Sequence, residues 1–366
     1  MTQIKIAIRA DAAQQIGTGH VMRCLALADE LRTRGASVRF VCRQLPENLA
    51  TLIRAHGHTL SMLPPVKAGM AEHVHNDPAH AHWLGAAWEK DAQDTLASLA
   101  DTAGWDWIVV DHYGVDERWE KMLRRALDSK IMVIDDLADR KHDCDVLLDQ
   151  NFYADMETRY TAKVPTYCQL LLGPRYALLR DEFRQLRDHV KPREGGLKRI
   201  LIFFGGMDAG NYTARAVEAL ANMDSHDLHV DVVIGAQHTH REQIESACVE
   251  YGFVCHVQTN RMAELMAEAD ASIGAGGSAS LERCCLGLPA LIFAVAKNQE
   301  LASRDLANRG AAYLGEIEMF VAEIERALAL FLVPARLHEM SVKAAEIVDG
   351  QGAIRLSDTL FRGMGK

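Results

Sequence analysis

Short apolar runs alternate with amphipathic stretches along most of the chain, and this alternation limits the fold more than any other feature. The stretches between the runs carry apolar residues at helical spacing, as in Val21–Arg34 and Trp119–Leu127. Near-continuous apolar strands joined by helices are typical of a parallel sheet covered on both faces. The strands expected in the first half are Ile4–Ile8, Val38–Cys42, Trp107–Asp111, Ile131–Ile134 and Val146–Leu148.

The alternation stops once and then restarts, which indicates two domains. Residues 173–198 are charged and rich in turn residues, and they end in HVKPREGGLKR. RILIFFGG, HVDVVIG, FVCHV, ASIGAGG and ALIFAV then follow, each before a helix-like stretch. We therefore expect an α/β protein with two doubly wound Rossmann-like domains, over 1–172 and 199–343, joined by a linker at 173–198. The expected ligand cleft lies between the domains at the carboxyl ends of the strands, and a helix over 344–366 can pack back on the first domain.

Charge, hydropathy and cysteine spacing exclude several classes of protein. A net charge of −10 argues against a general nucleic-acid binder, which carries a basic face. No apolar run approaches the roughly 18 residues that span a bilayer, and the N-terminus has no signal-peptide pattern. The eight cysteines show no CxxC or zinc-finger spacing, so we expect reduced thiols. These features predict a cytoplasmic protein without stable membrane insertion.

The first candidate site is GTGH, Gly17 to His20, between an apolar run and a helix. Glycines at 17 and 19 allow positive φ angles and a close approach by a ligand. His20 lies in the first helical turn, beside the positive end of the macrodipole, and Arg23 shares its face. Both charges disfavour the imidazolium, so we expect a neutral ring that acts as a base. The alternative is a tight turn with a helix-start histidine; GTGHVM lacks the sixth-position glycine of a dinucleotide site.

A second glycine-rich turn, IGAGGSASLERCCLGLP at residues 273–289, fits a phosphate better. Ser278 begins a helix, so the backbone N–H groups of Gly276, Gly277 and Ser278 can point at an anion. Glu282 is one turn further along the same helix face. This spacing suits a diphosphate at the helix tip and a ribose diol bound by the carboxylate. The alternative is a plain turn with a solvated Glu282.

Two more strand ends in the second half carry polar residues. In IFFGGMDAGN, Gly205 and Gly206 let a diphosphate or substrate approach, and Asp208 either contacts the ligand or caps the next helix. In AVAKNQE, Asn298 and Gln299 begin a helix on the carboxyl side of a strand, where binding loops gather. Helix capping is the alternative for this pair.

The first half adds strand-end residues of its own. IVVDHYG places Asp111, His112 and Tyr113 at the end of a strand, facing the expected cleft. IDDLAD places Asp135 and Asp136 at another, and an acidic pair can hold a divalent metal. No further oxygen ligands have convincing spacing, so we expect no metal.

A histidine-rich run, EHVHNDPAHAHW, fits none of these sites. Its pattern is irregular and Pro78 interrupts it, so the sequence predicts a surface loop. Its histidines are His73, His75, His80 and His82.

Seven stretches occur in the order found in one known family, and through them the chain resembles it. They are IRADAAQQIGTGHVMRCLALADELRTRG, VDHYG, LLDQN, YALLRDEF, FGGMD, IGAGGSASLERCCLGLP and NQE. The family is the UDP-2,4-diacetamido-2,4,6-trideoxy-β-L-altropyranose hydrolases of pseudaminic acid biosynthesis. The resemblance runs from about residue 4 to about residue 310, and the opening motif is its most specific part.

The resemblance implies a two-domain GT-B-type fold, similar to the murein N-acetylglucosaminyltransferase. It implies hydrolysis of that UDP-sugar to UDP and 2,4-diacetamido-2,4,6-trideoxy-L-altrose, by attack of water at the anomeric carbon with inversion and without metal or cofactor. His20 matches the general base, Asn298 matches an asparagine that handles the substrate, and Gly276, Gly277, Ser278 and Glu282 match the UDP contacts. The other predicted contacts are Arg9, Asp11, Gly17, Gly19, Arg23, Asp111, Tyr113 and Gln299 for the substrate and Gly205, Gly206 and Asp208 for UDP.

Two other functions fit the same motifs. A GT-B glycosyltransferase would move the sugar to an acceptor. Membrane-associated examples should expose an apolar and basic patch on the first domain, and the sequence of this acidic chain shows no obvious patch of that kind. A non-catalytic nucleotide-sugar binder would keep the turn at residues 276–282. It would have no need for His20, Arg23 and Asp111 around a water molecule.

Overall fold

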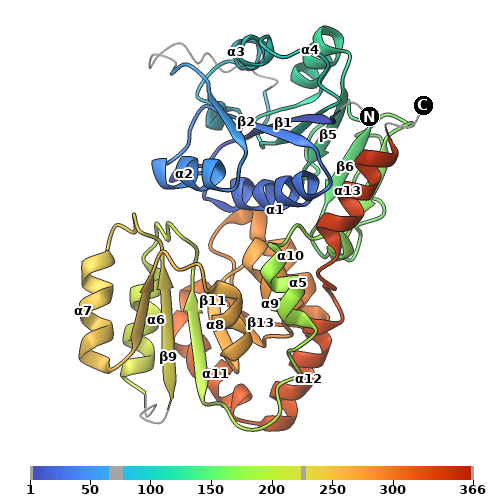
Figure 1. Cartoon of the computed structure of the whole chain (residues 1–366). Coiled ribbons are helices and arrows are strands. Elements are labelled where there is room, and N and C mark those ends of the chain that lie inside the picture. The colour runs from blue at the N-terminus through green and yellow to red at the C-terminus, as the bar shows by residue number, and fades with distance from the viewer. Residues whose placement is uncertain (1–2, 66–76, 224–227, 364–366) are drawn as a thin grey trace. The chain divides into compact units, whose positions relative to one another are not determined.

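The structure is a computed structural model that describes residues 3–65, 77–223 and 228–363, and it contains two α/β units (Figure 1). Unit 1 takes its described residues from Met1–Gln150, Asp155–Leu178 and Gln351–Lys366. Unit 2 takes them from Asn151–Ala154 and Leu179–Gly350. Each unit is built on one parallel sheet, which confirms the expected fold class.

Unit 1 has a seven-stranded sheet in the order β3-β2-β1-β4-β5-β6-β7. Helices α1, α2 and α13 cover one face and α3 and α4 the other. The strands are β1 (Lys5–Ala10), β2 (Ser37–Cys42), β3 (Thr59–Met62), β4 (Trp107–Asp111), β5 (Lys130–Ile134), β6 (Val146–Asp149) and β7 (Gln169–Leu172). The helices are α1 (Gly19–Thr33), α2 (Glu47–Ala55), η1 (Ala81–Leu84), α3 (Trp88–Leu99), α4 (Glu117–Leu127), η2 (Pro174–Tyr176) and α13 (Gly352–Arg362).

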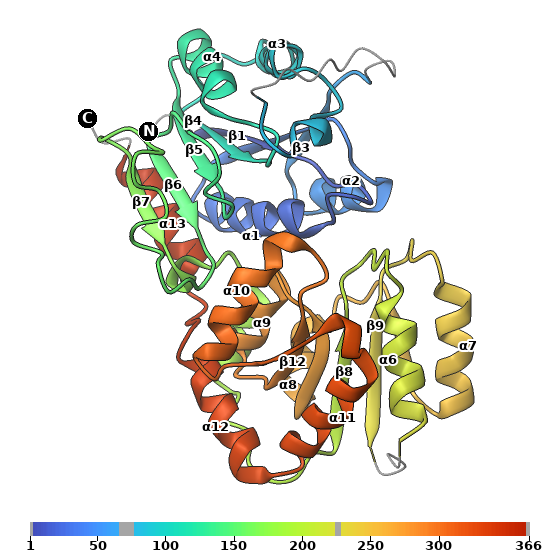
Figure 2. The same cartoon turned by 180° about the vertical axis from the view of Figure 1, so that it is seen from behind.

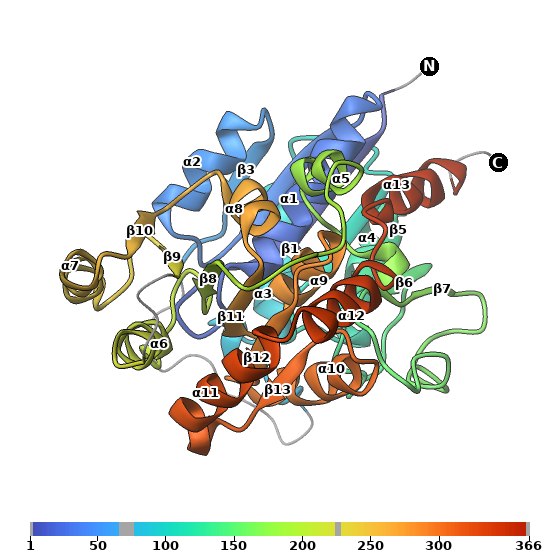
Figure 3. The ribbon, with the colours of Figure 1, turned by 90° about the horizontal axis from the view of Figure 1, so that it is seen from below.

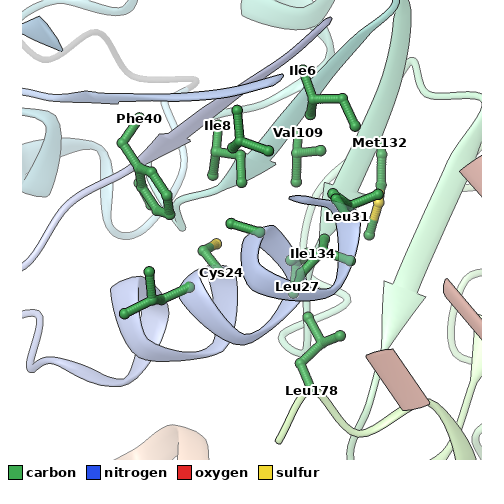
Figure 4. Packing of buried hydrophobic residues seen from close by; sticks show 14 of the residues in the cluster. Ile6, Ile8, Cys24, Leu27, Leu31, Phe40, Val109, Met132, Ile134 and Leu178 are labelled. Atoms are coloured by element: carbon green, nitrogen blue, oxygen red, sulfur yellow. The ribbon is translucent and has the colours of Figure 1, made fainter. Parts of the chain in front are cut away.

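The period of two along each strand divides the apolar side chains of unit 1 between two cores. Ile6 and Ile8 of β1 join the core under α1, whereas Ala7 joins the core under α3 and α4. Figure 4 shows the first core, where Cys24, Leu27 and Leu31 of α1 face the sheet. Burial on both faces explains why the central strands are continuous apolar runs.

Unit 2 repeats this plan with a six-stranded parallel sheet in the order β10-β9-β8-β11-β12-β13. Its strands are β8 (Arg199–Phe203), β9 (His229–Ile234), β10 (Val254–Val257), β11 (Ala271–Ala275), β12 (Ala290–Phe293) and β13 (Tyr313–Gly315). One face packs on α6 (Tyr212–Ala221), α7 (Arg241–Tyr251), α11 (Phe320–Phe331) and α12 (Pro334–Ala345). A short helix, η3 (Ile317–Met319), directly precedes α11. The other carries α5 (Asp181–Arg187), α8 (Met262–Glu268), α9 (Ser278–Cys285) and α10 (Lys297–Asn308). Figure 3 shows α6 beside α7 at one end of this sheet.

Both sheets change direction at one place. In unit 1 the chain runs from β1 outward through β2 and β3, and from β4 outward the other way, so the loops after β1 and β4 diverge. In unit 2 the loops after β8 and β11 diverge in the same manner. Ligands of open α/β sheets bind at such switch points, outside the carboxyl ends of the strands.

Residues 173–198 and the C-terminal segment are both ordered parts of the units. Within 173–198, η2 belongs to unit 1, and α5 packs against α8 and α9 in unit 2. The Arg193 guanidinium donates to carbonyl oxygens that follow α8 and α9, including those of Ala269 and Gly287. At the C-terminus, α13 packs on α1 in unit 1, on the side of the sheet formed by β6 and β7 (Figure 2).

Contacts of three kinds hold α13 on unit 1: a buried side chain, a hydrogen bond and an ion pair. The Leu360 side chain is fully buried in the core under α1. The Trp107 indole N–H donates to the Leu360 carbonyl at 3.1 Å, and the Arg34 guanidinium pairs with Asp358 at 2.5 Å. The C-terminal segment therefore completes the first sheet's core although it is far from it in sequence.

Replacing Leu360 by alanine should lower the free energy of unfolding of unit 1 by about 2–5 kcal/mol, because it leaves a cavity between α13 and the sheet. All five tryptophans lie in unit 1, so urea denaturation followed by tryptophan fluorescence reports on this unit. The control is Arg362→Ala, at an exposed end of the same helix. A Leu360→Ala midpoint equal to that of the control would contradict the packing of α13 on unit 1.

Candidate functional site

His20 and Asp111 lie at the switch point of the unit 1 sheet. Ala10, the last residue of β1, is opposite Asp111, the last residue of β4. The loop after β1 leads through Gly17, whose φ is 78°, into α1, which starts at Gly19. His20 is therefore in the first turn of α1 and next to the end of β4, as two neighbouring parallel strands require.

The Asp111 carboxylate joins three side chains of α1. Its Oδ1 accepts from His20 Nδ1 at 2.6 Å, and the Arg23 guanidinium donates to both of its oxygens at 2.7 Å. Cys24 Sγ lies 3.4 Å from Oδ2. Burial alone would raise the pKa of Asp111, but the Arg23 charge and the His20 contact hold that pKa well below its usual range. Asp111 is thus ionised at neutral pH.

The carboxylate fixes which nitrogen of His20 is free. An ionised carboxylate only accepts hydrogen bonds, so the Nδ1 beside it carries a proton. A neutral ring then has its lone pair on Nε2, which is the arrangement of a general base oriented by an acid. The His20 side chain is 10% exposed.

Arg23 contacts a second carboxylate of unit 1 besides Asp111. Its guanidinium is shared by two carboxylates, Asp111 and, at 3.1 Å, Asp136. Two negative charges face one positive charge here. The side chains of His20, Arg23, Asp111 and Asp136 thus form one connected group.

The predicted acidic pair is split between two roles. Asp135 is fully buried, pairs with Arg140 at 2.8 Å and accepts from the Tyr160 hydroxyl. Asp136 instead accepts from the Tyr113 hydroxyl at 2.5 Å and from Arg23. Because the carboxylates of Asp135 and Asp136 bind different partners, they do not form a pair of metal ligands. In residues 3–65, 77–223 and 228–363, no group of three or more His, Cys, Asp or Glu side chains could hold a metal ion.

Arg9 and Asp11, predicted to bind substrate, lie behind the site in a buried ion network. Arg9 donates to both Asp11 oxygens and to Asp91, and Arg43 also reaches Asp91. Arg9 and Asp11 are 1% and 0% exposed, and the Arg9 charge lowers the pKa of Asp11 against the effect of burial. Asp11 also accepts from the Arg43 backbone N–H. These contacts fix the start of the loop after β1, and all the polar atoms that Arg9 and Asp11 use point into the protein.

The glycine-rich turn of unit 2 lies at the second switch point, between β11 and α9. Gly277 has a φ of 86°, and a Cβ on Gly276 would lie 2.5 Å from Ser303 Oγ, so both positions need glycine. The Gly276 N–H donates to the Phe293 carbonyl at 2.9 Å. The expectation that this amide points at an anion is therefore wrong. The amides of Gly277, Ser278 and Ala279, in the first turn of α9, remain as anion donors.

Two arginines near this turn were not singled out from the sequence. Arg283 is buried and donates to the Ala275 and Phe203 carbonyls, so it ties together the ends of β11 and β8. Burial lowers the pKa of Arg283 to about 10. Arg180 lies 3.5 Å from Glu282, whose side chain is 18% exposed and whose pKa is raised by burial. Both arginines look like ordinary helix or loop cations in the sequence, which gives no signal of these contacts.

The other predicted UDP contacts differ in geometry. Both Asp208 oxygens accept backbone N–H groups, from Tyr212 at 3.0 Å and Thr213 at 2.7 Å. Asp208 thus caps α6, the alternative weighed from the sequence. Gly205 has a φ of 101°. Gly206 lies so close to Gly235 that a Cβ on Gly235 would be 2.1 Å from the Gly206 carbonyl oxygen.

Asn298 and Gln299 occupy the first turn of α10 and have different surroundings. The Gln299 Oε1 accepts from the Val295 N–H at 3.1 Å, and its side chain lies over Gly276 and Gly277. Asn298 is exposed. Gln299 therefore shapes the glycine turn, while Asn298 is available to a ligand.

The histidine-rich run is described only in part. His73 and His75 lie outside the described residues. His80 and His82 flank the start of η1, where the His80 ring lies 4.4 Å from the Trp83 ring and 5.6 Å from the Tyr113 ring. The predicted surface loop thus reaches the ring that contacts His20. In the same described residues, no helix has the length and apolar character needed to cross a membrane.

Three relatives resemble the chain at about a quarter identity. The Bacillus subtilis spore coat polysaccharide biosynthesis protein SpsG is 24% identical, over 97% of each chain. The Campylobacter jejuni UDP-2,4-diacetamido-2,4,6-trideoxy-β-L-altropyranose hydrolase is 25% identical, over 84% of this chain and 97% of that protein. The uncharacterized protein MJ1062 of Methanocaldococcus jannaschii is 24% identical over 79% of this chain, which spans 55% of MJ1062, about half its length. No protein-family model matches the chain.

Solved structures share the fold over almost the whole chain. MurG of Acinetobacter baumannii superposes with a TM-score of 0.61 at 16% identity, covering 99% of this chain and all of MurG. UGT2 of Phytolacca americana, complexed with UDP-2-fluoro-glucose and pterostilbene, gives a TM-score of 0.69 at 12% identity, covering 99% of this chain and all of UGT2. The chain therefore has the two-unit fold of the GT-B glycosyltransferases.

Replacing Asp111 by asparagine should lower the free energy of unfolding of unit 1 by about 3–5 kcal/mol at pH 7, because Arg23 loses a buried partner. The pKa of Asp111 is lowered in the folded protein, so its contribution is complete above the unfolded pKa of about 3.9 and is lost as the pH falls below it. The difference in stability between wild type and variant should therefore begin to narrow below about pH 4 and shrink further as the pH falls toward the lowered pKa of the folded protein.

Urea titrations followed by tryptophan fluorescence at pH 7, 4 and 3 measure this difference. Asp101→Asn is the matched control, because Asp101 pairs with Arg39 on the surface of the same unit and is 68% exposed. Its effect on the free energy of unfolding should be small at every pH, as is usual for an exposed ion pair. A gap between wild type and Asp111→Asn that does not change with pH would contradict an ionised Asp111.

Proposed function

We propose that the chain hydrolyses UDP-2,4-diacetamido-2,4,6-trideoxy-β-L-altropyranose to UDP and 2,4-diacetamido-2,4,6-trideoxy-L-altrose. The observation that carries this proposal is the 2.6 Å contact between His20 Nδ1 and Asp111, which leaves Nε2 as a base. Similarity to the Campylobacter jejuni hydrolase over 84% of the chain supports this choice of substrate. The motifs quoted for the family resemblance include both His20 and Asp111.

In the proposed reaction, His20 Nε2 takes a proton from a water molecule whose oxygen attacks the anomeric carbon. The new carbon–oxygen bond forms on the face opposite UDP, the anomeric C–O bond to UDP breaks, and the bonding electrons leave with the diphosphate. The imidazolium that forms lies beside Asp111, within the group that also contains Arg23 and Asp136. No metal or cofactor takes part in the proposed step.

The diphosphate is proposed to bind at the second glycine turn. The N–H groups of Gly277 and Ser278 and the positive end of the α9 dipole stabilise its charge as the bond breaks. Glu282 is proposed to accept the ribose hydroxyls, and Asn298 to contact the substrate. Gly205 and Gly206 provide room at the neighbouring strand end.

The shared fold supports a second candidate, a glycosyltransferase that binds the UDP-sugar at the same residues. His20 would then take the proton of an acceptor hydroxyl in place of water. The two candidates differ in one observable: the hydrolase releases UDP without an acceptor. We favour hydrolysis because the match to the Campylobacter jejuni hydrolase covers 97% of that protein.

Replacing His20 by alanine should lower kcat by about 10²–10⁴-fold, the usual contribution of a general base, with little change in UDP affinity. The assay follows UDP release from the UDP-sugar, and calorimetry measures UDP binding. His56→Ala is the control, because His56 also contacts a carboxylate of unit 1, Asp29, in a half-exposed position. Wild-type turnover in His20→Ala, in a normally folded protein, would disprove the assignment of the base.

A further inference from the structure

Residues 77–85 form a fixed segment over the end of β4. The Asp77 carboxylate pairs with Arg118 at 2.9 Å, and the Gln44 amide donates to the Trp83 carbonyl at 2.7 Å. Leu84 is fully buried among side chains of the core under α3 and α4. Ion pair, hydrogen bond and buried side chain together give this segment one position.

Gly114, the glycine of the DHYG motif, has no room for a side chain because this segment packs on it. A Cβ on Gly114 would lie 2.9 Å from Leu84 Cγ and 3.0 Å from the His80 carbonyl oxygen. A side chain at position 114 would therefore push the segment away from Tyr113. The sequence thus keeps residues 80–84 in direct contact with the strand end that carries Asp111.

The contact brings three rings together beside the ring of the proposed base, His20. The Tyr113 ring meets the His20 ring edge-on at 4.6 Å, and the Trp83 and His80 rings each lie 5.6 Å from it. Tyr113 is buried, whereas Trp83 and His80 are half-buried and form the outer part of the cluster. Aromatic rings at such distances pack favourably and hold one another in place.

We propose that Trp83 and His80 form an aromatic wall that binds the apolar substituents of the sugar, and so selects a deoxy, N-acylated glycosyl group over a hydroxyl-rich one. This inference rests on the proposed function, because it assigns the wall to the sugar at His20. The wall offers ring faces to methyl groups such as those of a 6-deoxy carbon or an acetamido group. Hydroxyl groups placed there would lose hydrogen bonds to water without compensation.

The charge state of His80 agrees with this role. Burial lowers the pKa of His80 below its usual value, so the ring is neutral at pH 7. The other groups that act on it are Asp139, His82, Arg140 and His112. A neutral ring beside Trp83 keeps the wall apolar at the pH where the enzyme would work.

The test compares Trp83→Ala with Trp83→Phe, which keeps a ring. KM, kcat and the UDP inhibition constant are measured with UDP-2,4-diacetamido-2,4,6-trideoxy-β-L-altropyranose and with UDP-N-acetylglucosamine, which has a hydroxymethyl group. One apolar substituent in a matching pocket changes kcat/KM by about 10–200-fold, so Trp83→Ala should raise KM for the deoxy sugar at least about tenfold. Its kcat and UDP inhibition should stay within about twofold, and Trp83→Phe should restore most of the affinity. Tyr167→Ala, which removes a 60% exposed ring elsewhere in unit 1, is the control.

Two results would contradict the proposed role of the aromatic wall. One is an unchanged KM for the deoxy sugar in Trp83→Ala. The other is a loss of affinity for UDP alone that equals the loss of affinity for the UDP-sugar. A binding measurement separates this failure from failure of the proposed function. Calorimetry in the His20→Ala background gives the ratio of the Kd of UDP to the Kd of the UDP-sugar, with no turnover needed. If wild type releases no UDP, the proposed hydrolysis fails, and a ratio that falls at least about tenfold with Trp83→Ala still supports the wall. A ratio that does not fall rejects it.

Discussion

The Asp111 carboxylate is the group on which the site in unit 1 depends. It lies at the end of β4 and binds His20 and Arg23 of α1, so it joins the two elements that diverge at the switch point of the sheet. A buried carboxylate needs charged or hydrogen-bonding partners, and these partners are the same groups that the proposed chemistry uses. Asp136 adds a second negative charge through Arg23 and reaches Tyr113. Folding and the orientation of the base are therefore set by one set of contacts.

The sequence predicts the fold because the sheets are buried on both faces. Central strands such as β1, β4 and β11 lie between two layers of helices, which makes them unbroken apolar runs. Strands β3, β7 and β13 were not predicted. All three are short and lie at the edges of their sheets, where part of the strand is exposed. The contribution of α13 to unit 1 depends on packing between distant segments, which local periodicity does not contain.

The candidate sites were predictable in place and only partly in detail. Strand ends and glycine turns fix where loops meet, so His20 and Asp111 could be placed at one edge from the sequence. The sequence does not predict which atoms of a polar group are taken up by hydrogen bonds within the protein. Both Asp208 oxygens accept hydrogen bonds from backbone amides of α6, and the Gly276 amide donates to a carbonyl of the neighbouring strand. The role of Trp83 depends on a segment that carries no regular pattern, and only its packing against the DHYG glycine brings it to the site.

Attack of water at the anomeric carbon is tested most directly with isotopically labelled solvent. The UDP-sugar is incubated with the protein in H₂¹⁸O, with a metal chelator and without an acceptor, and the products are analysed by mass spectrometry. Hydrolysis as proposed places the label in the free sugar and leaves UDP unlabelled, with UDP and sugar formed in equal amounts. Label in UDP would show cleavage of a phosphorus–oxygen bond, and no UDP release without an acceptor would show a transferase; either result contradicts the proposed reaction.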